Sequence, residues 1–472
     1  MGKTLLNVGA AVLIGIALRY VVNLDPVWWL AWIAPGALLA LALRVDGFWR
    51  RQTLVMLAIV IGVSSNFTYL RSVMPLPAVI AALTGLSLVW LLIIGVSRRV
   101  IATYRAGWTV LALPVMFVAV DTALTHFTPD GNWGSLGYTQ ADVLPIAQLV
   151  SVAGVGGVLF VLALFNSALA LALHFRLALP GGRAAYSTAA IVVIAAAGFG
   201  WWRLQAPVDG REVAFGLVAI DDYIPNAKSP VSVTVWDRYD SQVEALAASG
   251  ARIVLLPEKI DVLSSGDAME RNARLGRVAA ARHVWLVAGL GVDDGRERRN
   301  EAWWYTPSGE RITNYLKHHM APPEREFVPG HEYPTNEIDG IRYGVAICKD
   351  MHFADLGRGF GEREAAVMLV PAWDFHRDRF MAMNITKLRG IESGFTIVRS
   401  SRDGLLTVSD AYGRMLASEE SGKLPGSALL SKAKVGAHVP TLYQRTGDLL
   451  GWLCLALAPL LILASFLRPR RS

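Results

Sequence analysis

The sequence predicts a membrane-embedded bundle of about eight helices joined to a layered domain of mixed α/β structure. The 472 residues are 53% hydrophobic and only 18% charged, a balance typical of integral membrane proteins. Residues 1–205 are almost entirely apolar, whereas residues 206–446 have the composition of a soluble domain. We therefore expect a seven-helix transmembrane domain over 1–205, an α/β domain over 206–446 and a C-terminal transmembrane helix over 447–472.

Eight apolar runs carry the transmembrane prediction. Each is close to the ~20 residues that a helix needs to cross a hydrocarbon layer of ~30 Å. The sixth run is longer, and we expect it to tilt or to extend past the membrane interface. The runs are Leu5–Val22, Trp28–Leu43, Thr53–Leu70, Leu76–Val96, Trp108–Thr125, Leu144–Leu173, Ala185–Trp202 and Leu449–Leu467.

Basic residues between the runs predict the orientation. Lys3 precedes the first run, and the loops on the opposite side hold Arg71 and little else. The positive-inside rule then puts both termini in the cytoplasm and the α/β domain on the outer side. The net charge of +7 does not indicate nucleic-acid binding, because no basic face with interleaved aromatic residues occurs. The arginines on the cytoplasmic side are Arg44, Arg50, Arg51, Arg98, Arg99, Arg105, Arg176, Arg183, Arg468, Arg470 and Arg471.

One outer loop, residues 126–145, is long for a connector and rich in glycine and aromatic residues. Two interpretations stay open for it: an aromatic belt at the membrane interface, or a surface that meets the α/β domain or a lipid headgroup. Asp121 precedes this loop near the end of the fifth run. It is either a wet interfacial carboxylate or a functional one.

Apolar strands alternate with helices in the α/β domain, which predicts a sheet covered on both faces. Residues 302–305 and 313–316 flank a Pro-Ser-Gly turn and predict a hairpin. The expected strands are Val213–Ile220, Arg252–Leu256, Val284–Gly289, Tyr343–Ile347, Ala366–Val370 and Thr396–Ser400, and the expected helices are Val233–Ala248, Ala268–Arg282 and Arg379–Gly394.

Three residues, two of them at the ends of these strands, form a candidate catalytic set. Cys348 follows the strand in IRYGVAICKDMHF, Glu258 ends RIVLLPE, and Lys317 lies in YLKHHMAPPEREFVPG. Acyl transfer through a thioester needs an ionised thiol, a proton shuttle and a cation for the oxyanion. Cys348 alone would more often be a small buried hydrophobe. Glu258 and Lys317, each in a matching sequence context, favour a nucleophile.

These motifs resemble known families. PEK at Glu258, the lysine segment and GVAICKD at Cys348 resemble the three catalytic signatures of the nitrilase, or carbon–nitrogen hydrolase, superfamily. The eight-span layout together with NWGSLGYTQAD, DAYGRMLAS and TLYQRTGD resembles the apolipoprotein N-acyltransferases. The resemblance covers essentially the whole chain. It implies an α-β-β-α sandwich for the α/β domain, and a location in the bacterial inner (plasma) membrane with that domain in the periplasm.

The resemblance implies a Glu258–Lys317–Cys348 triad. It further implies that Glu326, or its neighbour Glu324, supports the lysine and that a backbone N–H near Lys349 helps to stabilise the oxyanion. Asp350 stands near the position of a family glutamate that follows the nucleophile. Trp373 begins an aromatic stretch that is either core packing or a mobile lid over an acyl chain. The histidines lack paired ligand spacing, so we expect no metal, and we expect no cofactor.

The implied activity is acyl transfer from a membrane phospholipid, through a thioester on Cys348, to the α-amine of an S-diacylglyceryl cysteine at the N-terminus of an apolipoprotein. Lys259, Lys349 and Asp350 depart from the family pattern, as do the start of the domain, VAIDDYIP, and a one-residue insertion after Lys317. These departures leave open a membrane-anchored amidase, or a transferase for another amine or lipid. A transporter or scaffold with a relic outer domain is the non-enzymatic alternative.

Overall fold

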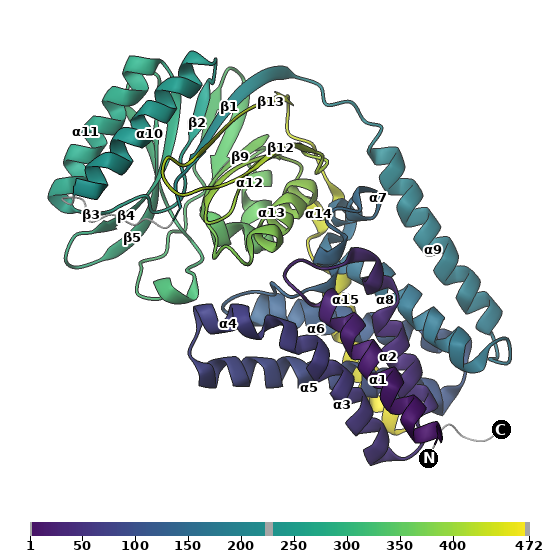
Figure 1. Cartoon of the computed structure of the whole chain (residues 1–472). Coiled ribbons are helices and arrows are strands. Elements are labelled where there is room, and N and C mark those ends of the chain that lie inside the picture. The colour runs from purple at the N-terminus through teal and green to yellow at the C-terminus, as the bar shows by residue number, and fades with distance from the viewer. Residues whose placement is uncertain (1, 222–229, 468–472) are drawn as a thin grey trace. The chain divides into compact units, whose positions relative to one another are not determined.

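The computed structural model describes residues 2–221 and 230–467, and it divides into two compact units. One unit, the membrane unit, joins Met1–Gln205 to Arg445–Ser472, and the other, the α/β unit, is Ala206–Gln444 (Figure 1). Residues 222–225 of the divergent VAIDDYIP segment lie outside the described residues. Arg468, Arg470 and Arg471 of the orientation argument also lie outside them.

The membrane unit contains, within the described residues, seven helical segments long and apolar enough to span a bilayer. They are Gly2–Val21, Phe48–Val73, Leu76–Tyr104, Gly107–Phe127, Val150–Phe175, Gly182–Arg203 and Leu449–Phe466. The second expected span, Trp28–Leu43, is present but broken. It consists of the 3₁₀ helix η1 (Trp28–Trp32) and the short helix α2 (Ala34–Arg44). The helices of this unit are α1 (Gly2–Val21), α3 (Phe48–Val63), α4 (Phe67–Val73), α5 (Leu76–Tyr104), α6 (Ala112–Phe127), α7 (Leu144–Ala147), α8 (Val150–Phe175), α9 (Gly182–Arg203), α14 (Leu442–Thr446, at the unit boundary) and α15 (Leu449–Phe466).

A buried asparagine stabilises the break between η1 and α2. Asn166 of α8 is fully buried, and its Oδ1 accepts a hydrogen bond of 2.7 Å from the N–H of Gly36. Its Nδ2 donates 2.9 Å bonds to the carbonyls of Ala31 and Leu162. Backbone groups released by a helix break must find partners inside a membrane protein, because hydrocarbon offers none. One side chain on α8 supplies both a donor and an acceptor here.

The long sixth run is also interrupted. It forms α7 and α8 as separate helices, and Gly154 near the start of α8 has a φ of +62°. Glycine adopts this left-handed conformation without steric cost. Gly137 of the outer loop packs against Val155 beside the bend, where a Cβ would come within 2.6 Å of that side chain. The length of the run therefore reflects a bend.

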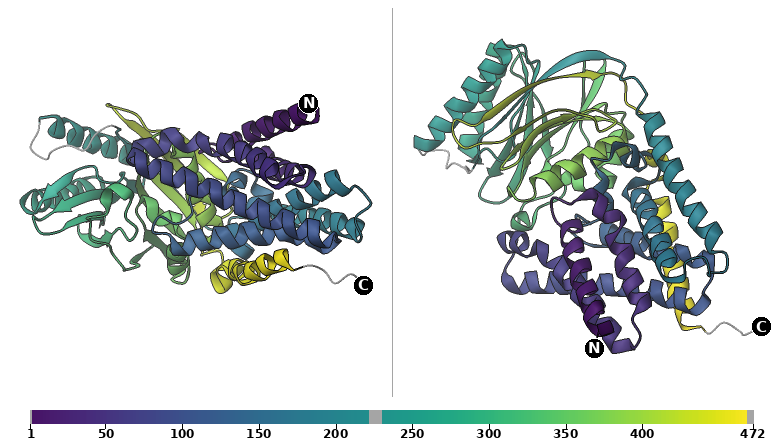
Figure 2. Two further views of the ribbon diagram at one scale, coloured as in Figure 1. Left: turned by 90° about the horizontal axis from the view of Figure 1, so that it is seen from below. Right: turned by 45° about the vertical axis from the view of Figure 1, so that its right-hand side comes forward.

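The C-terminal helix α15 returns to the bundle and packs against α6 and α5. Figure 2 shows it in yellow among the helices of the N-terminal part. Gly451 of α15 lies against Thr122, where a Cβ would come within 2.4 Å of the threonine Oγ1. His126 Nε2 lies 2.8 Å from a carboxylate oxygen of Asp448. The two parts of the membrane unit, far apart in sequence, thus form one packed bundle.

The α/β unit contains two stacked sheets. The first has seven strands in the order β13-β1-β2-β4-β5-β6, with β3 beside β4, and the second has six in the order β12-β11-β10-β9-β8-β7. The strands are β1 (Arg211–Ala219), β2 (Ile253–Leu255), β3 (Val262–Ser264), β4 (Trp285–Asp293), β5 (Arg298–Tyr305), β6 (Arg311–Leu316), β7 (Thr335–Ile338), β8 (Ile341–Val345), β9 (Val367–Trp373), β10 (Thr396–Arg402), β11 (Leu405–Ser409), β12 (Met415–Glu420) and β13 (Ser427–Val435).

Helices cover both outer faces of the sheet pair, which confirms the predicted α-β-β-α sandwich (Figure 1). Helices α10 and α11 pack on the outer face of the first sheet, and α12 and α13 pack on the outer face of the second sheet. One buried cluster, which includes Phe215, Val345 and Leu369, fills the space between the sheets. A second cluster, which includes Trp236 and Leu286, lies under α10 and α11. The helices are α10 (Pro230–Ala248), α11 (Ser265–Arg282), α12 (Ala354–Gly361) and α13 (Arg379–Ser393).

The strand arrangement brings the carboxyl ends of several strands to one edge of the sheet pair. Strands β8, β9 and β10 are parallel neighbours, so their carboxyl ends meet at the same edge of the second sheet. The N–H of Glu258, just after β2 of the first sheet, donates to the carbonyl of Ala372 in β9 at 3.2 Å. This bond joins the two sheets at the edge where the candidate catalytic residues emerge.

We predict that Asn166→Leu destabilises the membrane unit by about 1 kcal/mol, because the N–H of Gly36 and the carbonyl of Ala31 lose their partner inside the bundle. The measurement is the thermal unfolding midpoint in detergent. Ser72→Ala, which removes an exposed hydrogen bond to Tyr69, is the control and should leave the midpoint nearly unchanged. Equal midpoints for Asn166→Leu and the parent would contradict the role assigned to this asparagine.

Candidate active site

The three candidate catalytic residues each leave a strand at the joined edge of the sheets. Glu258 follows β2, Lys317 directly follows β6, and Cys348 opens the 3₁₀ helix η6 (Cys348–His352) after β8. Glu258 is 2% exposed and Lys317 is 1% exposed, so both charges are held inside the protein. Cys348 is partly accessible. A buried charge is tolerated only when it is paired and hydrogen-bonded, and the contacts of Lys317 meet this requirement.

Lys317 lies between two carboxylates. Its Nζ donates to Oε1 of Glu258 and to Oε2 of Glu324, each at 2.7 Å. Although burial lowers the pKa of Lys317, the carboxylates of Glu258 and Glu324 raise it well above its ordinary value. The side chain is therefore an ammonium at neutral pH, and it is fixed in position.

The structure places Glu324, rather than Glu326, beside Lys317. Glu324 is 3% exposed, accepts from the N–H of Ala321 at 3.2 Å and forms a second ion pair with Lys259. Although burial opposes the shift, the two lysines lower the pKa of Glu324 to about 2. The side chain of Glu326 is 65% exposed and pairs with an arginine at the surface. The one-residue insertion made these neighbours hard to separate in the sequence.

Asn300 is a member of the site that the sequence did not reveal. This asparagine of β5 is fully buried, and its Nδ2 donates to Glu258 at 2.6 Å and to Glu324 at 2.9 Å. It therefore bridges the two carboxylates between which Lys317 lies. The sequence signal that could have revealed Asn300 is an amide side chain followed by the mostly apolar residues 301–305.

Cys348 occupies a strained turn. Its φ is +47°, which is rare for any residue with a side chain, and its Sγ lies 3.5 Å from the carbonyl oxygen of Trp373. Burial, and then the carboxylate of Glu258, raise the pKa of the Cys348 thiol well above its ordinary value, while Lys317 opposes this shift. The resting sulfur is therefore protonated, and it needs a base at the moment it reacts.

Asp350 fixes the turn that carries Cys348 to the segment that carries Lys317. It is fully buried and accepts from the N–H of Ile347 at 3.0 Å and from the hydroxyl of Tyr315 at 2.7 Å. The two backbone N–H groups that follow Lys317 donate to the same carboxylate at 3.1 and 2.8 Å. Its contacts are those of a positioning residue.

The two lysines that depart from the family pattern differ in where they point. The Nζ of Lys349 donates to the carbonyl of Met320 at 3.0 Å. Lys259 pairs with Glu324 and lies over the rings of Trp373 and Phe327, 5.1 and 5.2 Å from their centroids. Lys259 has a φ of +44°, which turns the chain directly after Glu258. It is a second buried cation in the same charge network.

Two cations contact the ring of Trp373. The guanidinium carbon of Arg402 lies 3.9 Å from the centroid of the Trp373 ring, closer than the Nζ of Lys259. The indole Nε1–H of Trp373 donates to Asp403 at 2.8 Å. These contacts fix the side chain of Trp373, whose carbonyl oxygen lies 3.5 Å from the sulfur of Cys348. Met381 and Met383 of the following helix are 8% and 9% exposed, which favours core packing for that part of the aromatic stretch.

A buried Arg399–Asp374 ion pair, absent from the sequence-based set, lies close enough to influence the thiol of Cys348 electrostatically. No group of three histidine, cysteine or acidic side chains suited to a metal occurs in residues 2–221 and 230–467. The chemistry available here is that of an acid–base pair, an ammonium and a sulfur.

Comparison with known families matches both units of the chain. Residues 15–168 match the apolipoprotein N-acyltransferase N-terminal domain, and residues 230–418 match carbon–nitrogen hydrolase. Apolipoprotein N-acyltransferase from Geobacter metallireducens is 24% identical over 76% of this chain and 74% of its own length. The protein of the same name from Bradyrhizobium diazoefficiens is 25% identical over 76% and 75%. Human omega-amidase NIT2 is 24% identical over 50% of this chain and 96% of its own length.

Among solved structures, an amidase from Nesterenkonia sp. has a TM-score of 0.44 and 19% identity, covering 52% of this chain and 97% of that one.

We predict that Glu258→Gln lowers the pKa of Cys348, because the carboxylate that disfavours the thiolate is removed and Lys317 is left to favour it. The measurement is the pH midpoint of iodoacetamide alkylation of Cys348, followed by mass spectrometry in a Cys454→Ser background. The parent midpoint should lie above the ~8.5 of a free thiol. Glu326→Gln is the control for charge and should not move it. An upward movement in Glu258→Gln would contradict the prediction.

We further predict that Glu324→Gln destabilises the α/β unit by about 3–5 kcal/mol, because it leaves two buried ammonium groups without a shared carboxylate. The neighbouring change Glu326→Gln removes an exposed ion pair and should cost less than about 1 kcal/mol. Denaturant unfolding followed by tryptophan fluorescence measures both. Similar losses for the two variants would show that Glu324 does not have the structural role its contacts indicate.

Proposed function

The chain belongs to the apolipoprotein N-acyltransferase family, and on that premise we propose that it transfers a fatty acyl group from a membrane phospholipid to the N-terminal amine of a lipid-modified apolipoprotein. The family implies lipoprotein substrates and membrane lipid donors, and the seven apolar spans fit a membrane protein. The finer assignments, to an S-diacylglyceryl cysteine as acceptor and to the residues of the site, are part of the proposal.

In the first half-reaction Glu258 takes the thiol proton while the sulfur of Cys348 forms a bond to an ester carbonyl carbon of the phospholipid. The ammonium of Lys317 and the backbone N–H of Lys349 stabilise the oxyanion that results. The carbon–oxygen ester bond then breaks. Glu258 returns the proton to the leaving glycerol oxygen, and a lysophospholipid departs from a thioester enzyme.

In the second half-reaction the acceptor amine attacks the thioester carbonyl, and its proton passes to Glu258. Collapse of this intermediate breaks the carbon–sulfur bond. The proton returns to sulfur, which restores the thiol and releases the amide product. Because the thiol pKa is raised, Glu258 has to remove the proton as the sulfur attacks and return it as the sulfur leaves.

One observation supports the mechanism above all others: the hydrogen-bonded sequence Glu258–Lys317–Glu324 within electrostatic range of a cysteine on a positive-φ turn. Such a turn presents the sulfur to a substrate, while the paired carboxylates keep the cation charged and still. Preorganised charge of this kind is typically the largest single contribution to stabilising an oxyanion.

The orientation is proposed on the arginine distribution. Arg44, Arg98 and Arg176 represent the loops that we assign to the cytoplasm, which leaves Ala206–Gln444 in the periplasm of an inner-membrane protein. The phospholipid donor and the lipid-modified apolipoprotein would then reach the enzyme from the outer leaflet of the inner membrane.

An amidase or a transferase for a different amine is the second candidate. It is favoured by Lys259, which adds a buried cation to the charge network, and by the similarity to omega-amidase NIT2. The two candidates differ in the acceptor and the donor, but both pass through an acyl enzyme.

We predict that the purified protein, incubated with a phospholipid that carries a labelled acyl chain, gains the mass of that chain on Cys348, and that Cys348→Ala gains none. Cys454→Ser, which removes the other cysteine, should acylate as the parent does. Adding a synthetic N-terminal peptide with an S-diacylglyceryl cysteine should discharge the label onto the peptide.

Acylation of Cys348→Ala, or of another residue in the parent, would overturn the nucleophile assignment. Release of the label by glutamine or ammonia, without transfer to the lipopeptide, would favour the second candidate.

A further inference from the structure

A cavity of about 420 Å³ lies within the membrane unit. It is formed by α3, α5 and α15 with the end of α2, and none of its sixteen lining residues belongs to the α/β unit that holds Glu258, Lys317 and Cys348. The volume is within the range of small-molecule sites in proteins. It is therefore a separate site from the candidate active site.

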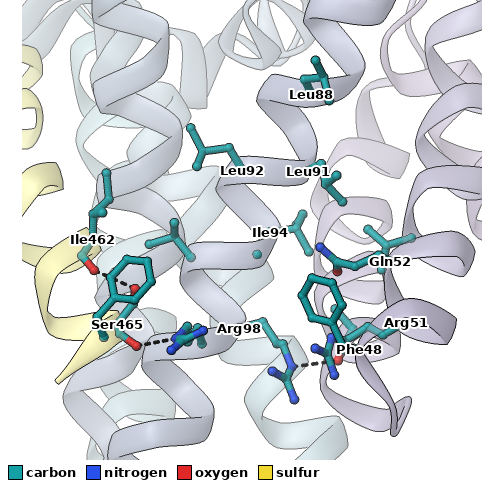
Figure 3. Close-up of a pocket in the computed structure, with 16 residues that line it drawn as sticks. Phe48, Arg51, Gln52, Leu88, Leu91, Leu92, Ile94, Arg98, Ile462 and Ser465 are labelled. Carbon is teal, nitrogen blue, oxygen red and sulfur yellow. Dashed lines mark hydrogen bonds between the residues drawn. The ribbon is translucent and has the colours of Figure 1, made fainter. Parts of the chain in front are cut away.

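The cavity is polar at one end and apolar at the other. Figure 3 shows Leu88, Leu91 and Leu92 of α5 at one end and Arg98 and Arg51 at the other. From Leu88 to Arg99 the helix rises about 16 Å, at 1.5 Å a residue. The polar lining residues are Arg51, Gln52, Arg98, Arg99 and Ser465.

Two of the guanidinium groups at the polar end are held in place by main-chain carbonyls. Arg98 Nε donates to Ala42 at 3.2 Å, and Arg99 Nε donates to Ser465 at 2.5 Å. Within residues 2–221 and 230–467, none of Arg51, Arg98 and Arg99 has a carboxylate within ion-pair distance. Asp46 is the acidic residue within electrostatic range of Arg98, so positive charge remains in excess.

Clustered arginines repel one another, and an anion relieves that repulsion. A guanidinium presents planar paired donors that match phosphate oxygens. An adjoining apolar channel suits an acyl chain and disfavours a hydrated inorganic anion. A phosphate group attached to a hydrocarbon chain meets both requirements at once.

We propose that this cavity binds an anionic phospholipid, with its phosphate at Arg51, Arg98 and Arg99 and part of one acyl chain between α3, α5 and α15. The remainder of the lipid lies in the bilayer. Bound in this way, the lipid contacts helices from both ends of the sequence and stabilises their association. The proposal does not depend on the acyltransferase assignment.

Two glycines of α5 provide a matched pair for the test. A Cβ added at Gly95, which lines the cavity, or at Gly85, which does not, meets no atom within 4 Å. Gly95→Leu therefore fills the apolar channel without forcing the backbone to move, and Gly85→Leu makes the same change on the exposed surface of the same helix. Both should fold.

The arginines also have a matched control. The triple variant Arg51→Gln, Arg98→Gln, Arg99→Gln removes the charges at the cavity. The variant Arg44→Gln, Arg105→Gln, Arg176→Gln removes the same number of charges from exposed positions at the ends of α2, α5 and α8, outside the cavity.

The experiment titrates delipidated full-length protein in detergent with dioleoylphosphatidylglycerol, dioleoylphosphatidylcholine or inorganic phosphate. Binding is measured by native mass spectrometry and by the rise in unfolding temperature. We expect one more molecule of the anionic lipid than of dioleoylphosphatidylcholine to bind, and the anionic lipid to raise the midpoint more. The cavity triple variant should bind it on the order of 100-fold more weakly, and Gly95→Leu should also lose binding.

Equal binding of both lipids, or retention of binding by the cavity triple variant together with Gly95→Leu, would overturn the proposal. Equal losses in the two arginine variants would show a diffuse surface attraction instead of a site. A midpoint raised as strongly by inorganic phosphate would show an anion site without a lipid channel.

Discussion

The ammonium of Lys317, held between Glu258 and Glu324, is the interaction on which the candidate active site depends. An uncompensated charge at this depth would be expelled or neutralised. Two carboxylates at 2.7 Å, with Asn300 bridging them, keep it charged and immobile. In the proposed mechanism, this one cation accompanies the acid–base work of Glu258 and stabilises the negative charge that develops beside Cys348.

The rest of the α/β unit positions these groups. The parallel strands β8 and β9 bring the cysteine turn and Trp373 to one edge, and a backbone hydrogen bond from Glu258 to Ala372 joins the first sheet to this edge. Asp350 then connects the cysteine turn to the segment after Lys317. The sandwich thus supports the turn in which Cys348 has a φ of +47°, and Asp350 holds this turn by its hydrogen bond to the N–H of Ile347.

The membrane unit also pairs its buried polar groups with one another, because the hydrocarbon of the bilayer offers them no hydrogen bonds. Asn166 satisfies the backbone at the η1–α2 break, and glycines permit the bend in α8 and the close approach of α15. The cavity with Arg51, Arg98 and Arg99 is the contrasting case, because its charges lack a carboxylate partner within the described part of the chain. Lipid supplies the counter-charge in our proposal.

The sequence by itself determined the fold class, because apolar periodicity is a local property of the chain. Its short motifs also predicted Glu258, Lys317 and Cys348 as the catalytic candidates. Only the tertiary structure decided that Glu324, and not Glu326, meets Lys317, since a one-residue insertion leaves the two indistinguishable until the loop is folded. It also revealed Asn300, Lys259 and the Arg399–Asp374 pair as neighbours of the site. Those residues lie on separate strands and loops, and only pairing of the strands and packing of the sheets brings their side chains together.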